Sequence, residues 1–356
     1  MQWGGVEEQH PAVAAVGRRA AGLEANALAR LSAFDIDEAT IVAATEHLFA
    51  NSRLTLNFHP DRRDSLGRTV AAGLLSDGRY RSQFETGISN GGRFAVPGGD
   101  RTRWESALFD DAYDNGTLSR PVYGALDPFG DSYGGAPRFG SSFVVLESHC
   151  LARATFCVGD SHSEPVDIGT LREPLSILAG AFDRCSTGTG FGRGLTVDRL
   201  LTALGKRSSD SLSARELDSY IEAQIHGSVD FERDVQAIVL DPSFRGSAVE
   251  RDLTLASERF GFAIGWNEGS EVRPEQIPPE FRGGDMLDLA RATARPDGLL
   301  DAAAIGTAIA NVPFTAPSIE GDPEASPRQR YKKLWHCCLK FGRPIPGPPA
   351  RDDQRD

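Results

Sequence analysis

The segment at residues 220–227 (YIEAQIHG) holds a carboxylate, an amide and an imidazole at alternate positions. If this segment is a strand, Glu222, Gln224 and His226 share one face and apolar side chains take the other. A fixed acid with oriented polar neighbours is what carboxylate chemistry requires. A helix also fits, because a capping-box pattern at residues 213–216 precedes the segment. Both structures stay open here, and the three residues are the candidate catalytic groups.

A second row of polar side chains comes earlier in the chain. In residues 53–59 (RLTLNFH) apolar and polar residues alternate, which is the period of a half-buried strand. The leucines and the phenylalanine face a core. The opposite face carries Arg53, Thr55, Asn57 and His59.

The stretch at residues 78–140 is rich in Gly, Arg, Asp and aromatic residues and has few aliphatic runs. So long an irregular stretch in a compact domain is usually functional or disordered, and its aromatic residues favour function. We therefore expect it to contribute to the cleft that holds His59 and Glu222. The polar residues expected there are Arg81, Gln83 and Thr86.

Histidines supply an alternative hypothesis. Imidazole and carboxylate ligands suit zinc, iron or manganese. A metal-dependent hydrolase would use His59, Asp160, His162 and His226, although the sequence has no HxH or HxxxH pair. A further alternative is a non-enzymatic binding module whose irregular region, residues 78–140, holds a partner.

Two glycine-rich stretches resemble known motifs but lie in the wrong context. Residues 87–91 (GISNG) match the nucleophile elbow of serine hydrolases, which requires a buried strand before it and a helix after it. Residues 188–194 (GTGFGRG) are not a GxGxxG motif in register and follow a helical pattern. We interpret both as loops.

The composition excludes several classes of protein. A net charge of -12 argues against general nucleic-acid binding and against an anionic membrane surface. The five cysteines form no CxxC pair, so neither a zinc ribbon nor a disulfide scaffold is expected. No signal-peptide pattern and no run of 18 apolar residues occur. We expect a cytoplasmic protein that does not enter a membrane.

The elements that must position these groups follow from periodicity, and together they predict an α+β protein. Helices are expected at residues 11–33, from Asp35 or Asp37 to Ala50, and at 65–75, 170–182 and 196–204. Further strands are expected at residues 143–146, 154–158 and 235–240. The expected organisation is N-terminal helices at 1–50, a catalytic α+β domain at 51–290, a helix and loop region at 291–342 and a disordered, dispensable tail at 343–356. Residues 312–330 are expected to be a linker.

Six stretches of the sequence carry a resemblance to a known family: NFHPDR at 57–62, YRSQFETGISNG at 80–91, RPVYGAL at 120–126, PRFGS at 137–141, GDSH at 159–162 and EAQIHG at 222–227. Together they resemble a bacterial family of unknown function, the domain-of-unknown-function family numbered 3626. The resemblance runs from about residue 50 to 285. It brings no established activity.

A looser resemblance implies a mechanism. The order of elements is similar to the ADP-ribosyltransferase fold, which implies a mixed β core and NAD as co-substrate. The function implied is an NAD-consuming ADP-ribosyltransferase or an NAD glycohydrolase. The acceptor would be a protein, a nucleic acid or a small molecule.

That resemblance also assigns residues. His59 matches the first motif of the fold, with Arg62 near the pyrophosphate. Ser141 or Ser142 matches the middle motif, with Tyr123 as an alternative. Glu222 matches the late acid, although the usual catalytic position is taken here by Gln224, which leaves Glu85 as another possible acid. The full set of residues implied to bind NAD is His59, Arg62, Tyr80, Arg81, Gln83, Thr86, Tyr123, Ser141 and Ser142.

Overall fold

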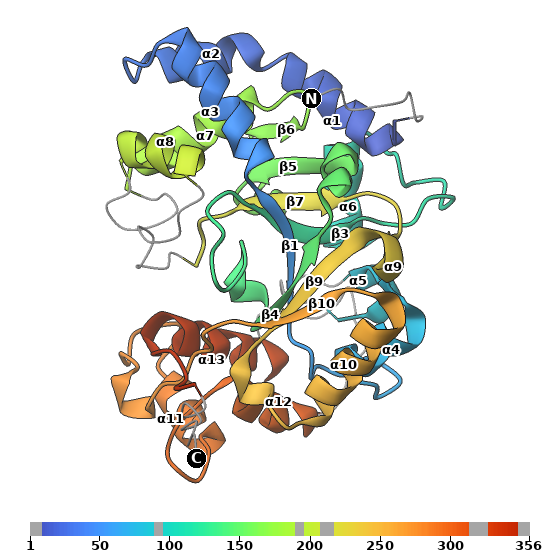
Figure 1. Ribbon diagram of the computed structural model, residues 1–356, viewed down its shortest axis with the longest axis vertical. Coiled ribbons are helices and arrows are strands. Elements are labelled where there is room, and N and C mark those ends of the chain that lie inside the picture. Colours follow the sequence, from blue (N-terminus) through green and yellow to red (C-terminus); the bar gives the residue numbers. More distant parts are fainter. Residues whose placement is uncertain (1–8, 89–94, 189–195, 207–216, 313–326, 348–356) are drawn as a thin grey trace, which may run out of the picture.

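The structure is a computed structural model that describes residues 9–88, 95–188, 196–206, 217–312 and 327–347. It confirms the expected α+β class, with helices around one mixed sheet of eight strands (Figure 1). The strand order in this sheet is β10-β9-β4-β1-β3-β7-β5-β6. These strands are β1 (Arg53–Phe58), β3 (Val122–Asp127), β4 (Ser142–Leu146), β5 (Ala154–Val158), β6 (Ile168–Thr170), β7 (Ile221–Ile225), β9 (Val235–Leu240) and β10 (Ala263–Trp266). A separate two-stranded sheet pairs β2 (Arg79–Tyr80) with β8 (Val229–Asp230).

Strand β1 lies near the centre of the large sheet, between β3 and β4. All pairs in this sheet are antiparallel except β9 with β10. The segment at residues 220–227 is a strand, β7, between β3 and β5, so the strand interpretation is confirmed over the helix. The capping-box pattern at 213–216 lies outside the described residues, as does most of each glycine-rich stretch at 87–91 and 188–194.

Thirteen helices surround the sheets in the part of the chain that the structure describes. They are α1 (Pro11–Ala21), α2 (Glu24–Ser32), α3 (Glu38–Ala50), α4 (Val70–Asp77), α5 (Gln83–Thr86), α6 (Asp100–Phe109), α7 (Leu175–Ser186), α8 (Val197–Lys206), α9 (Phe231–Asp234), α10 (Ala248–Phe260), α11 (Met286–Thr293), α12 (Ala302–Ala310) and α13 (Pro327–Phe341). Figure 1 shows α1, α2 and α3 at the β6 end of the molecule and α11, α12 and α13 at the opposite end.

The N-terminal helices form as expected, with one break. The helix expected at 11–33 is interrupted at Gly22 and Leu23, which separate α1 from α2. Asp37 caps α3 by accepting a hydrogen bond from the backbone of Thr40 at 2.7 Å. At the end of α3, Phe49 packs edge-on against Phe156 of β5, with ring centroids 5.1 Å apart. These helices therefore share a core with the sheet.

The prediction that residues 78–140 are irregular is wrong. The stretch contains β2 of the two-stranded sheet, the helices α5 and α6, and β3 of the large sheet. Two helices also start later than expected. Thr69 caps α4, and the expected start of α7 is taken by the edge strand β6. Strand β10 was missed.

The C-terminal region also differs from expectation. Helix α13 begins at Pro327, inside the expected linker, and its Trp335 is fully buried. Residues 343–347, expected in a disordered tail, carry backbone hydrogen bonds from Arg343 to Glu271 and from Ile345 to Glu268. The proposed domain boundaries stay predictions. Among the described residues, no helix has both the length and the apolar character needed to cross a membrane.

Candidate functional site

A cavity opens over the polar face of the large sheet. Its volume is about 1250 Å³, counting the space open to solvent at its mouth. The walls come from β1, β3, β7, α4, α6, the β2–α5 segment and the turn after β5. The predicted site residues that line it are His59, Arg62, Tyr80, Arg81, Gln83, Thr86, Tyr123 and Glu222. The prediction that Arg81, Gln83 and Thr86 share a cleft with His59 and Glu222 is confirmed.

Sheet register explains why these groups meet. In β3 and β7, Tyr123 lies opposite Gln224 and Ala125 lies opposite Glu222. Directly paired residues point to the same face, so the alternation of side chains along β3 and β7 builds one polar surface across the two strands.

Glu222 lies at the floor of the cavity and is 5% exposed. Its Oε1 accepts a hydrogen bond from Gln224 Nε2 at 2.9 Å, and Gln224 Oε1 in turn accepts from Thr155 Oγ1 at 2.7 Å. Burial, together with the nearby charge of Asp160, raises the pKa of Glu222 to about 7. The carboxyl group can therefore gain or lose a proton near neutral pH.

An aspartate–histidine pair stands beside Glu222. His162 Nδ1 lies 2.7 Å from Asp160 Oδ1, and both residues line the cavity. Burial opposes ionisation of Asp160, but the hydrogen bonds and charge of His162 together with the charge of Arg138 outweigh it and lower the pKa of Asp160. The imidazole also meets the Trp104 ring edge-on, at 6.2 Å between centroids. Two neighbouring carboxyls thus have pKa values moved in opposite directions, an arrangement typical of acid–base sites.

Helix α6 brings a buried charge cluster to the same wall. Glu105 is fully buried and accepts hydrogen bonds from Arg120 Nη1 and from the Tyr123 hydroxyl, each at 2.8 Å. Arg101, one helical turn before Glu105, lies between the rings of Trp104 and Tyr123. Helix α6 was not predicted from the sequence, and this cluster was therefore missed. The signal was present, since Arg101 and Glu105 are spaced i,i+4.

The histidine end of the cavity is equally buried. His59 is 4% exposed and meets Trp335 edge-on at 5.5 Å. Burial, with the nearby positive charge of Arg62, holds the pKa of His59 well below its usual value, so the ring is neutral. Arg62 is 6% exposed, and its Nη1 has no hydrogen-bond partner among the described residues. Its ion pair with Asp61 spans 3.9 Å from Nη1 to Oδ1.

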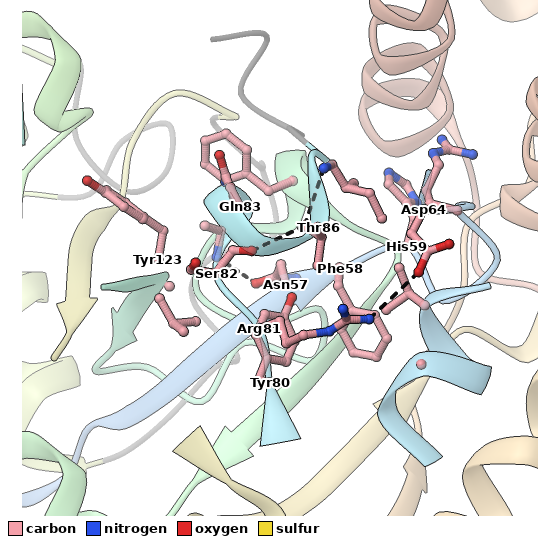
Figure 2. Close-up of a pocket in the computed structure, with 18 of the residues that line it drawn as sticks. Asn57, Phe58, His59, Asp64, Tyr80, Arg81, Ser82, Gln83, Thr86 and Tyr123 are labelled. Atoms are coloured by element: carbon pink, nitrogen blue, oxygen red, sulfur yellow. Dashed lines mark hydrogen bonds and ion pairs between the residues drawn. The ribbon is translucent and has the colours of Figure 1, made fainter. Parts of the chain in front are cut away.

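Local hydrogen bonds and ion pairs hold the β2–α5 segment, which lies between these two ends of the cavity. Figure 2 shows Tyr123 and His59 at opposite sides, with Arg81, Ser82, Gln83 and Thr86 between them. Glu85 accepts from the backbone of Ser82 at 2.9 Å and pairs with Arg79, so this possible catalytic acid serves as a helix cap. Arg81 pairs with Asp77 at 2.7 Å.

Four of the predicted site residues do not line the cavity. Gln224 is buried behind Glu222. His226 is enclosed by hydrogen bonds to Tyr113 and Thr155. In the remaining pair, Ser142 Oγ accepts from the backbone of Asp241 at 3.1 Å, and the carbonyl of Ser141 accepts from Asn267 Nδ2 at 2.8 Å. Their contacts are structural.

The proposed metal ligands do not converge. His226 lies outside the cavity that holds His59, Asp160 and His162. Within the described residues, the group with metal-ligand distances is His149, Cys150 and Asp234.

That other group is better explained as an ion-pair network. Asp234 already accepts from His149 Nε2, Arg153 Nη2 and Arg233 Nε, each at 2.9 Å. Burial raises the pKa of Cys150 to about 11, so its thiol stays protonated. Neither set supports a metal site.

Comparison with known proteins bears on the same region. The profile of the family described as "Protein of unknown function (DUF3626)" matches residues 53–341. The chain belongs to this family. This confirms the first resemblance and extends it to the end of α13. The matched range includes the whole cavity and leaves out α1, α2 and α3.

Two curated phage proteins are also similar to this chain. It is 29% identical over 174 residues to the "Gene 2 protein" of Mycobacterium phage L5, and 27% identical over 175 residues to the "Gene 2 protein" of Mycobacterium phage D29. Each alignment covers 47% of this chain and 59% of the phage protein. The chain therefore spans about three fifths of the length of these relatives.

Proposed function

We propose that this chain consumes NAD, releasing nicotinamide and transferring ADP-ribose to water or to an acceptor. The observation that carries the proposal is the buried carboxyl of Glu222 at the floor of a cavity with polar and aromatic walls. Loss of nicotinamide creates positive charge on the ribose ring, as in glycoside hydrolysis. A fixed carboxylate next to that ring stabilises the charge as it develops.

In the proposed reaction the bond between ribose C1′ and the nicotinamide nitrogen breaks. The electron pair of that bond neutralises the positive charge of the ring, which leaves as nicotinamide. An oxygen or nitrogen of the acceptor then bonds to C1′ and gives its proton to His162, which Asp160 orients. Glu222 must be ionised in this step, while Gln224 holds its Oε1 in place.

The other lining residues have complementary roles in this proposal. The neutral ring of His59 and the guanidinium of Arg62 hold the adenosine and pyrophosphate ends of NAD. Tyr80 and Tyr123 offer ring faces for the nicotinamide. Arg81, Gln83 and Thr86 position the ligand from the β2–α5 segment. NAD is the only co-substrate proposed, and the acceptor class stays open.

A compartment is also part of the proposal. All five cysteines are free and buried. Disulfides are rare in the reducing cytoplasm, so free thiols fit that compartment. We therefore place the reaction in the cytoplasm.

The experiment is a nicotinamide-release assay on the wild type and single variants. The wild type should release nicotinamide from millimolar NAD. Glu222→Gln should lose most of the rate, whereas Glu85→Gln, a matched change at the capping glutamate, should keep it. If the wild type shows neither release nor a thermal shift with NAD, the proposal fails. Full activity in Glu222→Gln would show that Glu222 is not the carboxylate that the proposed reaction requires.

A further inference from the structure

The guanidinium group of Arg101 is buried without a full set of partners. The side chain is 5% exposed and lines the cavity. Among the described residues, its Nε and Nη1 atoms have no hydrogen-bond partner. Its ion pair with Glu105 spans 3.9 Å from Nη1 to Oε1, which is beyond hydrogen-bond distance. A buried charged group in this condition is costly unless something completes its hydrogen bonds.

Glu105 does not neutralise Arg101 by itself, because it already serves another arginine. Its Oε2 is bound by Arg120 Nη1 and its Oε1 by the Tyr123 hydroxyl, each at 2.8 Å. Two arginines therefore share one carboxylate, and the cluster keeps a net positive charge. This charge lies on the cavity wall, where an anionic group of a ligand could neutralise it.

Other contacts hold the guanidinium in place before any ligand binds. Its central carbon lies 4.7 Å from the centroid of the Trp104 ring and 4.5 Å from that of the Tyr123 ring. Cation–π contacts of this kind fix the plane of the group without using its N–H donors. Arg101 is thus held in position before a ligand binds, and its Nε and Nη1 donors have no hydrogen-bond partner among the described residues.

Three of the four acidic residues on the cavity wall are already paired with other side chains, and among the described residues the fourth, Glu222, forms no ion pair with Arg101. Asp64 pairs with Arg68 at 2.9 Å, and Asp77 pairs with Arg81 at 2.7 Å. Asp160 pairs with His162. Arg101 is therefore a cation on the wall whose donors are left for a ligand.

We propose that Arg101 is an anion-binding residue that takes a phosphate group of the bound ligand. Planar guanidinium donors match phosphate oxygens in a forked geometry. Arg101 stacks on Tyr123 of β3, and Ala125, the residue paired with Glu222, lies on the same face of that strand. Arg101 and Glu222 therefore line the same part of the cavity. The phosphate bound there is the one attached to the ribose on which Glu222 acts. This inference deepens the proposed function and rests on it for the identity of the ligand.

The test measures binding to the full chain by calorimetry, with ADP-ribose, inorganic pyrophosphate and adenosine as probes. Arg101→Gln should weaken ADP-ribose binding by about 10- to 100-fold, as expected for losing hydrogen bonds to a charged group. Pyrophosphate binding should weaken as well, and adenosine binding should not change. Arg103→Gln, on the same helix but 65% exposed at its side chain, is the matched control and should bind like the wild type.

The outcomes of these measurements separate the anion-binding role of Arg101 from the proposed reaction. Unchanged ADP-ribose affinity in Arg101→Gln overturns the proposal, as does a wild type that binds neither ADP-ribose nor pyrophosphate. If Arg101→Gln does not fold, Arg101→Lys retains the charge without the fork and should show reduced affinity. Pyrophosphate binding that depends on Arg101, without nicotinamide release by the wild type, would keep the anion site and reject the reaction. NAD turnover by the wild type, with no effect of Arg101→Gln on ADP-ribose affinity, would support the reaction and reject the anion site.

Discussion

At the scale of single residues, the protonation of Glu222 links the proposed reaction to pH. Its pKa of about 7 means that the ionised form increases from about pH 6 to about pH 8. Because the ribosyl transition state needs the carboxylate, nicotinamide release should rise over this range. Glu222→Gln should lower the rate by about 10²–10³ and abolish this rise. A pH–rate profile that is flat across neutrality in the wild type would contradict this role.

The same carboxyl affects stability in a direction that can be worked out. The pKa of Glu222 in the folded protein is about 7, above its ordinary value of 4.5, so folding favours the protonated form. Its contribution to stability is therefore complete below about pH 4.5 and is lost as the pH rises to about 7. The Glu222→Gln variant does not lose this stability, because an amide does not ionise.

We expect Glu222→Gln to be more stable than the wild type at about pH 8, by up to about 3 kcal/mol, with the difference vanishing near pH 4.5. Urea unfolding at both pH values measures the difference. Gln keeps the size of the side chain, so packing does not obscure the comparison. A variant less stable than the wild type at about pH 8 would show that the charge is compensated.

His226 is expected to act on the fold and not on the reaction. Its ring is 1% exposed, between the Tyr113 hydroxyl and Thr155 Oγ1, and it stacks on His10. His226→Ala leaves a cavity and an unpaired Tyr113 hydroxyl, while Thr155 keeps its bond to Gln224, so it should cost about 2–4 kcal/mol of stability. The rate per folded molecule should stay near that of the wild type. Loss of that rate at unchanged melting temperature would return His226 to the catalytic set.

At the scale of elements, strand β1 positions the cavity wall through one amide. Asn57 Nδ2 donates to the carbonyls of Tyr133 and Gly140, at 2.8 and 3.3 Å, and its Oδ1 accepts from the backbone of Ala136 at 3.1 Å. The loop it fixes carries Ala136 and Phe139 into the cavity. One side chain therefore sets the shape of a whole connection.

Asn57→Asp tests this arrangement, because it keeps the acceptor and replaces two donors with an oxygen facing two carbonyls. We expect a loss of about 2–4 kcal/mol in the free energy of unfolding and weaker ADP-ribose binding. Chemical unfolding and calorimetry measure the two effects. Unchanged binding in a folded variant would show that the loop does not shape the cavity.

The elements that could be predicted from sequence are those whose pattern is local. Alternation identified β1, and the polar face of β7 placed Glu222 correctly. Helix α6 and strand β3 were missed, because α6 has few aliphatic residues and β3 contains a glycine. The neighbours of Glu222 depend on long-range pairing, such as Cys157 of β5 opposite Glu222. No local pattern contains that information, so the joining of Asp160 to Glu222 could not be predicted.

At the scale of the whole molecule, helices from both ends of the chain pack around the sheet and the cavity. Helix α1 packs against β5 and β6, and α2 packs on α7. From the other end of the chain, α13 places Trp335 against His59. The Nε1 of Trp335 donates a hydrogen bond to the carbonyl of Pro137 at 2.9 Å. The histidine end of the cavity therefore depends on residues far along the chain.

Backbone hydrogen bonds hold the residues after α13 to the segment before η5 (Pro274–Gln276). Arg343 exchanges backbone hydrogen bonds with Glu271 at 3.0 and 2.9 Å, and Ile345 donates to Glu268 at 2.9 Å. These bonds fix the end of α13 and hence the position of Trp335. The ion pair between Arg343 and Glu271 adds little, because the arginine side chain is 66% exposed.

Truncation after Gly347 should therefore leave the melting temperature and ligand binding unchanged. Truncation after Gly342 removes all three backbone bonds and should cost about 2–3 kcal/mol of stability, at about 1 kcal/mol for each. It should also weaken ADP-ribose binding, because Trp335 no longer holds His59 in one orientation. Melting curves and calorimetry on the two truncated proteins measure both effects. If the shorter protein matches the longer one in both, residues 343–347 are dispensable, and α13 is held by its buried face alone.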